Sequence, residues 1–178
     1  MDFLKKNEKQ GLAFRLRPFE EADAPQLAVY ANNVEIARNL TNAFPHPYTL
    51  ENAQNFIAMT LSAQPIHVFG IEVNGQIAGG MGIHPQSDIM CKNAELGYWL
   101  AEPFWGRGIA SALVKDIIDY GFTHFDITRI YARPFGSNVA SQKVLEKVGF
   151  VLEARIKDNI YKWDRYEDEL IYGIRKNS

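Results

Sequence analysis

Apolar positions recur along the chain with two different spacings, which divide it into predicted strands and predicted helices. Alternation of apolar and polar residues, or a short apolar run between turn residues, predicts a strand. Recurrence every three or four positions predicts a helix that buries one face. The predicted strands are residues 13–18, 66–73, 76–83, 94–100, 129–133, 150–156 and 169–174. The predicted helices are residues 20–32, 49–63, 108–125 and 138–148.

Turn residues set several of these boundaries. Asn74 and Gly75 separate two apolar runs, and this pair predicts a hairpin because both central positions of a type I′ turn need positive φ. Thr49 is an expected N-cap, and Gly149 an expected C′ glycine. The element order is β-α-α-β-β-β-α-β-α-β-β. It predicts an α/β (α+β) fold with a mixed, mostly antiparallel twisted sheet of about seven strands and helices on both faces.

Composition narrows the class of protein. A chain of 178 residues with 47% hydrophobic and 22% charged residues predicts one globular domain over 1–178, with 1–10 expected to be flexible. The net charge of −2 disfavours nucleic acid as an obligatory partner. One cysteine, Cys91, excludes an intrachain disulfide and favours a reducing compartment. No apolar run has the length of a membrane span or signal peptide, so the expected location is the cytoplasm.

The stretch FWGRGIAS, residues 104–111, carries the first indication of chemistry. Gly106 and Gly108 lie between a predicted strand and a predicted helix. Main-chain N–H groups at such a turn have no partners within the helix, and the helix dipole adds to their attraction for phosphate. The stretch alone is also compatible with an ordinary strand-to-helix turn. It lacks the third glycine of a dinucleotide-binding fingerprint and the Gly-Lys-Ser/Thr of a P-loop.

Taken with AELGYWL (94–100) and NVASQKVLEKVGF (138–150), this stretch resembles the GNAT superfamily of acyl-CoA-dependent N-acetyltransferases, and most closely its RimJ and RimL branch. The resemblance covers about residues 13–175. The superfamily turn pattern Gln/Arg-x-x-Gly-x-Gly/Ala falls on Trp105, Gly108 and Ala110, so a tryptophan replaces the usual Gln or Arg.

The resemblance implies that the chain binds acetyl-CoA and acetylates an amine by direct attack. No covalent enzyme intermediate is expected, because Cys91 lies in a loop away from these stretches. No metal site is expected, because His46, His67 and His124 lack partners at metal-ligand spacing.

The resemblance also implies where the coenzyme binds. A main-chain N–H near Leu100 would hold the thioester oxygen, as an oxyanion-type donor. Asn138 would contact the coenzyme, and as a helix N-cap it could serve both roles. The coenzyme contacts expected in full are Tyr98, Trp99, Leu100, Trp105, Gly106, Arg107, Gly108, Ile109, Ala110, Ser111, Asn138 and Ser141.

Two catalytic residues are expected from the same resemblance. Many superfamily members have a tyrosine that reprotonates the departing thiolate, and this chain has Leu145 at that position. Ser141 is the expected substitute, although a serine in a first helical turn can simply satisfy the backbone. Glu95 is the first candidate for the base, acting directly or through water, and His84 is the second. Both also have ordinary structural interpretations, as a surface carboxylate and a structural histidine.

The acceptor is expected to be an N-terminal α-amine of a protein or peptide. An α-amine with a pKa of about 7.7 to 8 is roughly a tenth neutral at pH 7, whereas a lysine amine of about 10.4 is almost entirely charged. A small amine, a non-catalytic acyl-CoA sensor and a structural protein without a ligand are the alternatives. The aromatic C-terminal region is compatible with a homodimer. The residues expected around the acceptor are Phe44, Tyr48, His84, Tyr161 and Trp163.

Overall fold

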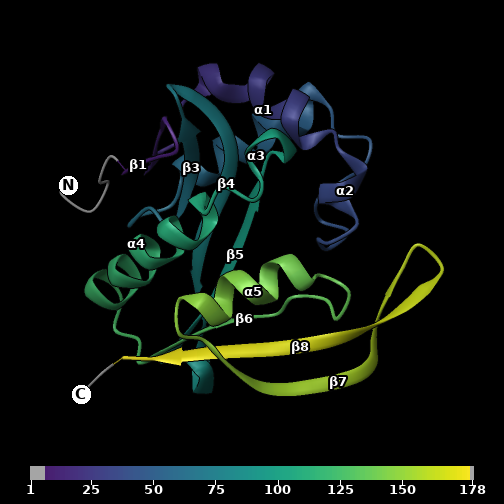
Figure 1. The fold of residues 1–178 in the computed structure, drawn as a ribbon. Helices are drawn as coiled ribbons and strands as arrows, with labels where there is room; N and C mark the ends of the chain where they lie inside the picture. The colour runs from purple at the N-terminus through teal and green to yellow at the C-terminus, as the bar shows by residue number, and fades with distance from the viewer. Residues whose placement is uncertain (1–6, 177–178) are drawn as a thin grey trace.

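One mixed sheet forms the centre of the computed structural model, which describes residues 7–176 (Figure 1). Its strand order is β1-β2-β3-β4-β5-β6-β8-β7. The strands are β1 (Asn7–Lys9), β2 (Leu12–Arg17), β3 (Val68–Val73), β4 (Gln76–Pro85), β5 (Asn93–Leu100), β6 (Arg129–Ala132), β7 (Val151–Lys162) and β8 (Arg165–Arg175). The α-helices are α1 (Ala24–Ala31), α2 (Val34–Ala37), α3 (Leu50–Leu61), α4 (Ile109–His124) and α5 (Val139–Lys147). Three short 3₁₀ turns are η1 (Glu21–Asp23), η2 (Asp88–Met90) and η3 (Glu102–Phe104).

The predicted fold class is confirmed, with corrections at three places. Residues 7–9, within the stretch expected to be flexible, form an eighth strand, and residues 1–6 lie outside the described part. Segment 33–48, expected to be irregular, contains the short helix α2. Segment 157–168, expected to be a loop, instead continues β7 and β8 into a tight hairpin whose turn residues, Trp163 and Asp164, have positive φ.

Helices cover both faces of the sheet (Figure 1). Helices α4 and α5 bury Ile109, Leu113 and Leu145 in one apolar cluster with the strands. On the other face, α1 and α3 bury Leu27 and Ile57 in a second cluster. The wide apolar stripe predicted for residues 108–125 is explained by this packing of α4 against the sheet.

Strands β5 and β6 form the parallel pair of this sheet, and their pairing is short. It joins Asn93–Glu95 to residues 129–131, after which β5 continues alone on that side to Leu100. On its other side β5 pairs with β4, and the Ala101 N–H bonds the Ala78 carbonyl. Main-chain groups of an antiparallel strand point to alternate sides, so the N–H groups of Tyr98 and Leu100 point toward the gap left by β6.

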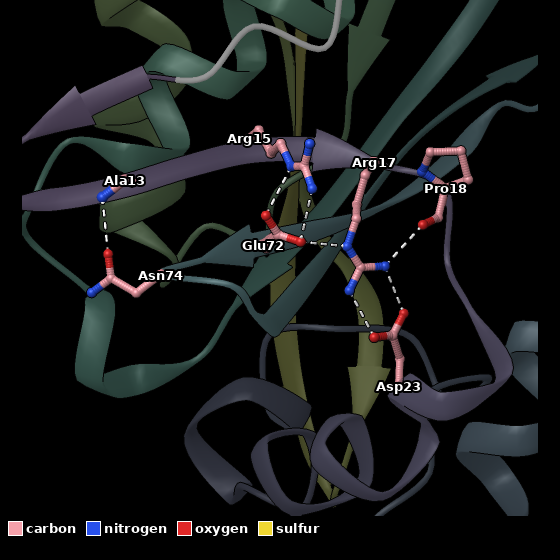
Figure 2. Close-up of polar contacts among 7 residues, drawn as sticks. All are labelled: Ala13, Arg15, Arg17, Pro18, Asp23, Glu72 and Asn74. Atoms are coloured by element: carbon pink, nitrogen blue, oxygen red, sulfur yellow. Dashed lines mark hydrogen bonds and ion pairs between the residues drawn. The ribbon is translucent and has the colours of Figure 1, made fainter.

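A partly buried ionic network joins β2 and β3 to the start of α1 (Figure 2). The Arg17 guanidinium donates to both carboxylate oxygens of Asp23, at 2.7 and 2.8 Å, and to Glu72 at 2.7 Å. Arg15 also donates to Glu72, at 2.8 Å. Burial acts to raise the pKa of Asp23, but the hydrogen bonds from Arg17 and the Glu20 N–H prevail and lower it. The Arg15 hydrogen bond is the main cause of the lowered pKa of Glu72.

Candidate active site

A cavity of about 440 Å³ lies beside the point where β5 and β6 diverge. Its walls come from the end of β5, the turn into α4, one face of α5, and α2 with the residues that follow it. The lining residues are Glu35, Ile36, Asn39, Leu40, Tyr98, Trp99, Leu100, Phe104, Trp105, Gly106, Gly108, Ile109, Ala110, Ser111, Asn138, Ala140, Ser141, Lys143, Val144 and Lys147.

The glycine turn predicted from the sequence forms one wall. Gly106 and Gly108 have φ of +71° and +75°, the left-handed region that favours glycine. Gly108 is the N-cap of the 16-residue helix α4 and supplies no side-chain cap, so the first-turn N–H groups have no capping partner within the described chain. Lys9 of β1 brings a cation to the same place, since its Nζ lies 2.6 Å from where a Cβ on Gly108 would be. These features suit a phosphate group of a coenzyme.

Trp105 has a structural partner inside this turn. Its Nε1–H donates to the Leu100 carbonyl at 2.6 Å, which ties the turn back to the end of β5. The carbonyl of Leu100 therefore already accepts a hydrogen bond from the indole, while the Leu100 N–H points toward the gap beside β6. An N–H group held at this position can act as an oxyanion donor.

Helix α5 places two predicted residues on the cavity. The Asn138 side chain accepts a hydrogen bond from the Ser141 N–H at 3.2 Å, which confirms its N-cap role. The Ser141 hydroxyl lies 2.9 Å from the Tyr98 hydroxyl. Leu145 is fully buried in the core, so the position that carries a tyrosine in many relatives contributes only packing here.

The structure brings together the residues predicted to bind the coenzyme, with the exception of Arg107. Eleven of the twelve line the cavity, whereas Arg107 is exposed in the turn and does not line it. Cys91 is exposed at the end of η2 and is not a lining residue. Residues 7–176 contain no group of three His, Cys, Asp or Glu side chains able to hold a metal ion, and no helix among them is long and apolar enough to cross a membrane.

The two candidate bases lie outside the cavity. Glu95 accepts hydrogen bonds from Arg133 at 2.9 and 3.1 Å. It is five residues before Leu100, a distance of about 16 Å along an extended strand. His84 lies opposite Glu95 on β4, with its ring 5.5 Å from that of His67. Desolvation, followed by the proximity of His67, lowers the pKa of His84. Neither side chain is positioned to take a proton directly from an amine in the cavity.

None of the five residues expected around the acceptor lines the cavity, and apart from His84 on β4 they separate into two groups. Tyr48 is buried in the second core cluster, where burial raises its pKa, and Phe44 packs between Tyr48 and Trp99. Tyr161 and Trp163 are exposed at the tip of the β7–β8 hairpin. The expected aromatic wall is therefore partly core, because a large aromatic ring gains more from burial than from exposure.

Several lining residues were not predicted. Helix α2 supplies Glu35, Ile36, Asn39 and Leu40 from its own turn and the residues that follow, within a segment that has no clear periodicity. Lys143 and Lys147, which were not among the residues expected to contact the coenzyme, lie at the cavity with Val144. Val144 lies three residues after Ser141 and Lys147 three after Val144, so the three-residue spacing was a signal for this face of α5.

Lys162 connects α2, which forms one wall of the cavity, to the tip of the β7–β8 hairpin. Its buried ammonium group donates to the main-chain carbonyls of Ala37 and Leu40, and it lies 4.9 Å from the centre of the Trp163 ring. Burial lowers the pKa of Lys162. The carbonyl of Ala37, at the end of α2, and that of Leu40, three residues later, thus accept from a side chain of β7, 125 residues further along the chain in the case of Ala37.

Known proteins are similar to this chain in sequence and in fold. Residues 14–151 match the family described as acetyltransferase (GNAT) domain. The chain is 31% identical to the uncharacterized N-acetyltransferase p20 of Bacillus licheniformis over 170 residues, covering 90% of this chain and 92% of p20. It is 28% identical to a Bacillus subtilis (strain 168) protein with the provisional name ribosomal N-acetyltransferase YdaF, covering 90% of each. The solved structure of RimL, the ribosomal L7/L12 α-N-protein acetyltransferase, in complex with coenzyme A has a TM-score of 0.81, with 23% identity and 97% coverage of each chain.

Proposed function

The chain belongs to the GNAT acetyltransferase family, and we propose that this N-acetyltransferase moves the acetyl group of acetyl-CoA to the N-terminal α-amine of a protein or peptide. The observation that carries the proposal is the shared cavity. The uncapped glycine turn, the diverging end of β5 and the Ser141 hydroxyl all open into it. The names of the relatives, which include ribosomal-protein acetyltransferases, support a protein N-terminus as the acceptor.

The coenzyme would lie with its phosphates on the N–H groups around Gly106 and Gly108. Lys143 and Lys147 would add positive charge at α5. The pantetheine arm of the coenzyme would follow the gap where the main chain of Tyr98 and Leu100 is exposed. Acetyl-CoA supplies an activated acetyl group as a thioester, and the protein supplies the geometry around it.

The catalytic roles follow from the groups at the cavity. The Leu100 N–H would stabilise the charge that develops on the carbonyl oxygen as the amine attacks. Ser141 would donate a proton to the departing sulfur. The amine nitrogen forms the new C–N bond as the C–S bond breaks. The amine loses one proton to water, the sulfur gains one from Ser141, and Ser141 takes one from solvent, so one N–H bond is exchanged for one S–H bond. We assign deprotonation of the amine to solvent water, because Arg133 holds the Glu95 carboxylate away from the cavity.

The test is thiol release from acetyl-CoA with three matched acceptors. The first is a peptide with a free α-amine and no lysine, the second is the same peptide N-blocked with one lysine, and the third is a polyamine. The proposal expects turnover on the first and at least tenfold less on the other two. Turnover on the polyamine alone would assign the enzyme to small-molecule acetylation. Silence on all three with coenzyme binding retained would contradict the proposed acceptor and favour an acyl-CoA sensor.

A further inference from the structure

The hydroxyl groups of Tyr98 and Ser141 form a pair inside the cavity. They lie 2.9 Å apart, although the residues are 43 positions apart in the chain, on β5 and α5. The Tyr98 ring packs against the core that lies under α4. Within residues 7–176 the Tyr98 hydroxyl has Ser141 as its hydrogen-bond partner and no other. A polar group placed in a cavity wall with a single partner fixes the direction of that partner.

We propose that Tyr98 is a positioning residue, which directs the Ser141 O–H toward the sulfur of the bound thioester. The inference rests on the proposed function, in which Ser141 is the proton donor. A serine hydroxyl has one hydrogen to donate and two lone pairs to accept with. When the phenol donates to Ser141 Oγ, the serine hydrogen stays available for another acceptor in the cavity. The phenol is the stronger acid of the two groups, which favours this direction of the hydrogen bond.

Without the phenol, Ser141 has an alternative that removes it from the reaction. A hydroxyl in a helix readily donates to a main-chain carbonyl three or four residues earlier, as Thr60 does to Ile57. For Ser141 the carbonyl three residues earlier is that of the N-cap, Asn138. That bond would use the one hydrogen that Ser141 can donate. Tyr98 therefore acts by making the productive rotamer the favoured one, and Asn138 holds the main chain of the same turn.

Tyr98 keeps its own proton in this arrangement. Burial is the main effect on the phenol and raises the pKa of Tyr98 to about 12. The phenol therefore stays protonated at neutral pH, and its O–H remains available to donate to Ser141 Oγ.

The experiment is a double-mutant cycle on the full chain, with Tyr98→Phe, Ser141→Ala and the double variant assayed for acetyl-CoA turnover. Tyr98→Phe removes one oxygen and keeps the packed ring. We expect it to lower kcat about tenfold while the Kd for coenzyme A changes by less than about twofold. In the Ser141→Ala background the same substitution should have no further effect, because there is no hydroxyl left to orient.

Tyr172→Phe is the matched control. Its hydroxyl donates to Glu146 at 2.8 Å outside the cavity, so this variant loses a buried phenol bond and should keep its kcat. The inference is overturned if Tyr98→Phe keeps the wild-type kcat, or if it lowers kcat by the same factor with and without Ser141. Failure of the proposed function is a different result: the wild-type protein would release no thiol with any amine, which overturns both. A Ser141→Ala variant with full kcat would overturn the inference while leaving the acetyltransferase assignment intact.

Discussion

Gly106 provides a sharp test of the proposed phosphate cradle, the glycine turn at Gly106 and Gly108, because it lines the cavity and faces open space. Its φ is +71°, and a Cβ built on it meets no atom within 4 Å. In Gly106→Ala the new methyl group would enter the space that the proposal gives to a coenzyme phosphate. The left-handed backbone costs an L-residue about 1 to 2 kcal/mol. For a domain of this size, that corresponds to a fall in Tm of roughly 2 to 8 °C.

Gly75→Ala separates this backbone strain from an effect on the ligand. Gly75 has φ of +81° in the β3–β4 turn, also meets no atom within 4 Å, and does not line the cavity. Both variants should therefore lose similar stability. Gly106→Ala should in addition weaken coenzyme A binding roughly tenfold to a hundredfold, as expected for the loss of one charge-assisted hydrogen bond of about 1.5 to 3 kcal/mol.

Isothermal titration with coenzyme A and with pantetheine measures this difference. Pantetheine lacks the phosphates, so its affinity should be the same in both variants. The Kd for coenzyme A should rise in Gly106→Ala and stay at the wild-type value in Gly75→Ala. Equal values of this Kd in the two variants, with equal losses of Tm, would refute the phosphate cradle.

Three further predictions concern ionic groups. The lowered pKa values of Asp23 and Glu72 stabilise the fold above the unfolded pKa of about 4, so Tm measured against pH should fall below about pH 4, and less steeply in Asp23→Asn. Glu95→Gln should change kcat/KM by less than about threefold, because Arg133 already holds this carboxylate outside the cavity; a tenfold loss in steady-state assays would restore Glu95 as the base. Lys162→Met should lower the calorimetric Tm by roughly 3 to 10 °C, because the carbonyls of Ala37 and Leu40 lose their buried donor. An unchanged Tm would contradict a stabilising role for Lys162.

The sequence patterns predicted the helices and strands that have one apolar and one polar face. The Asn74–Gly75 hairpin and the helix beginning after Gly108 were found because turn chemistry and apolar periodicity agree there. Strand β7 was cut short in the prediction because it is an edge strand, exposed along most of its length, and so has no alternation to detect. Its turn was missed because Trp163 and Asp164, rather than glycine, adopt the positive φ.

The candidate site divides in the same way. Local spacing placed Asn138 and Ser141 on one face of α5, and the glycine turn at the start of α4, as the structure has them. Helix α2 could not be found, because four residues are too few to show a helical period. Tyr48 was assigned to the acceptor site as an aromatic residue of segment 33–48, and the structure buries it in the core instead.

The short parallel pairing of β5 and β6 explains why the central part of the site is tertiary in origin. Because the pairing of β5 with β6 stops at Glu95, the following residues of β5 have main-chain groups without a neighbouring strand on that side. Helix α5 then approaches that gap and brings Ser141 to Tyr98. No local pattern encodes this contact, since it depends on where two strands part. A fully paired β5 would fill the gap with strand β6, remove the oxyanion donor at Leu100 and separate the hydroxyl pair. The divergence of two strands is thus the structural feature on which the proposed coenzyme binding and the proposed proton donation both depend.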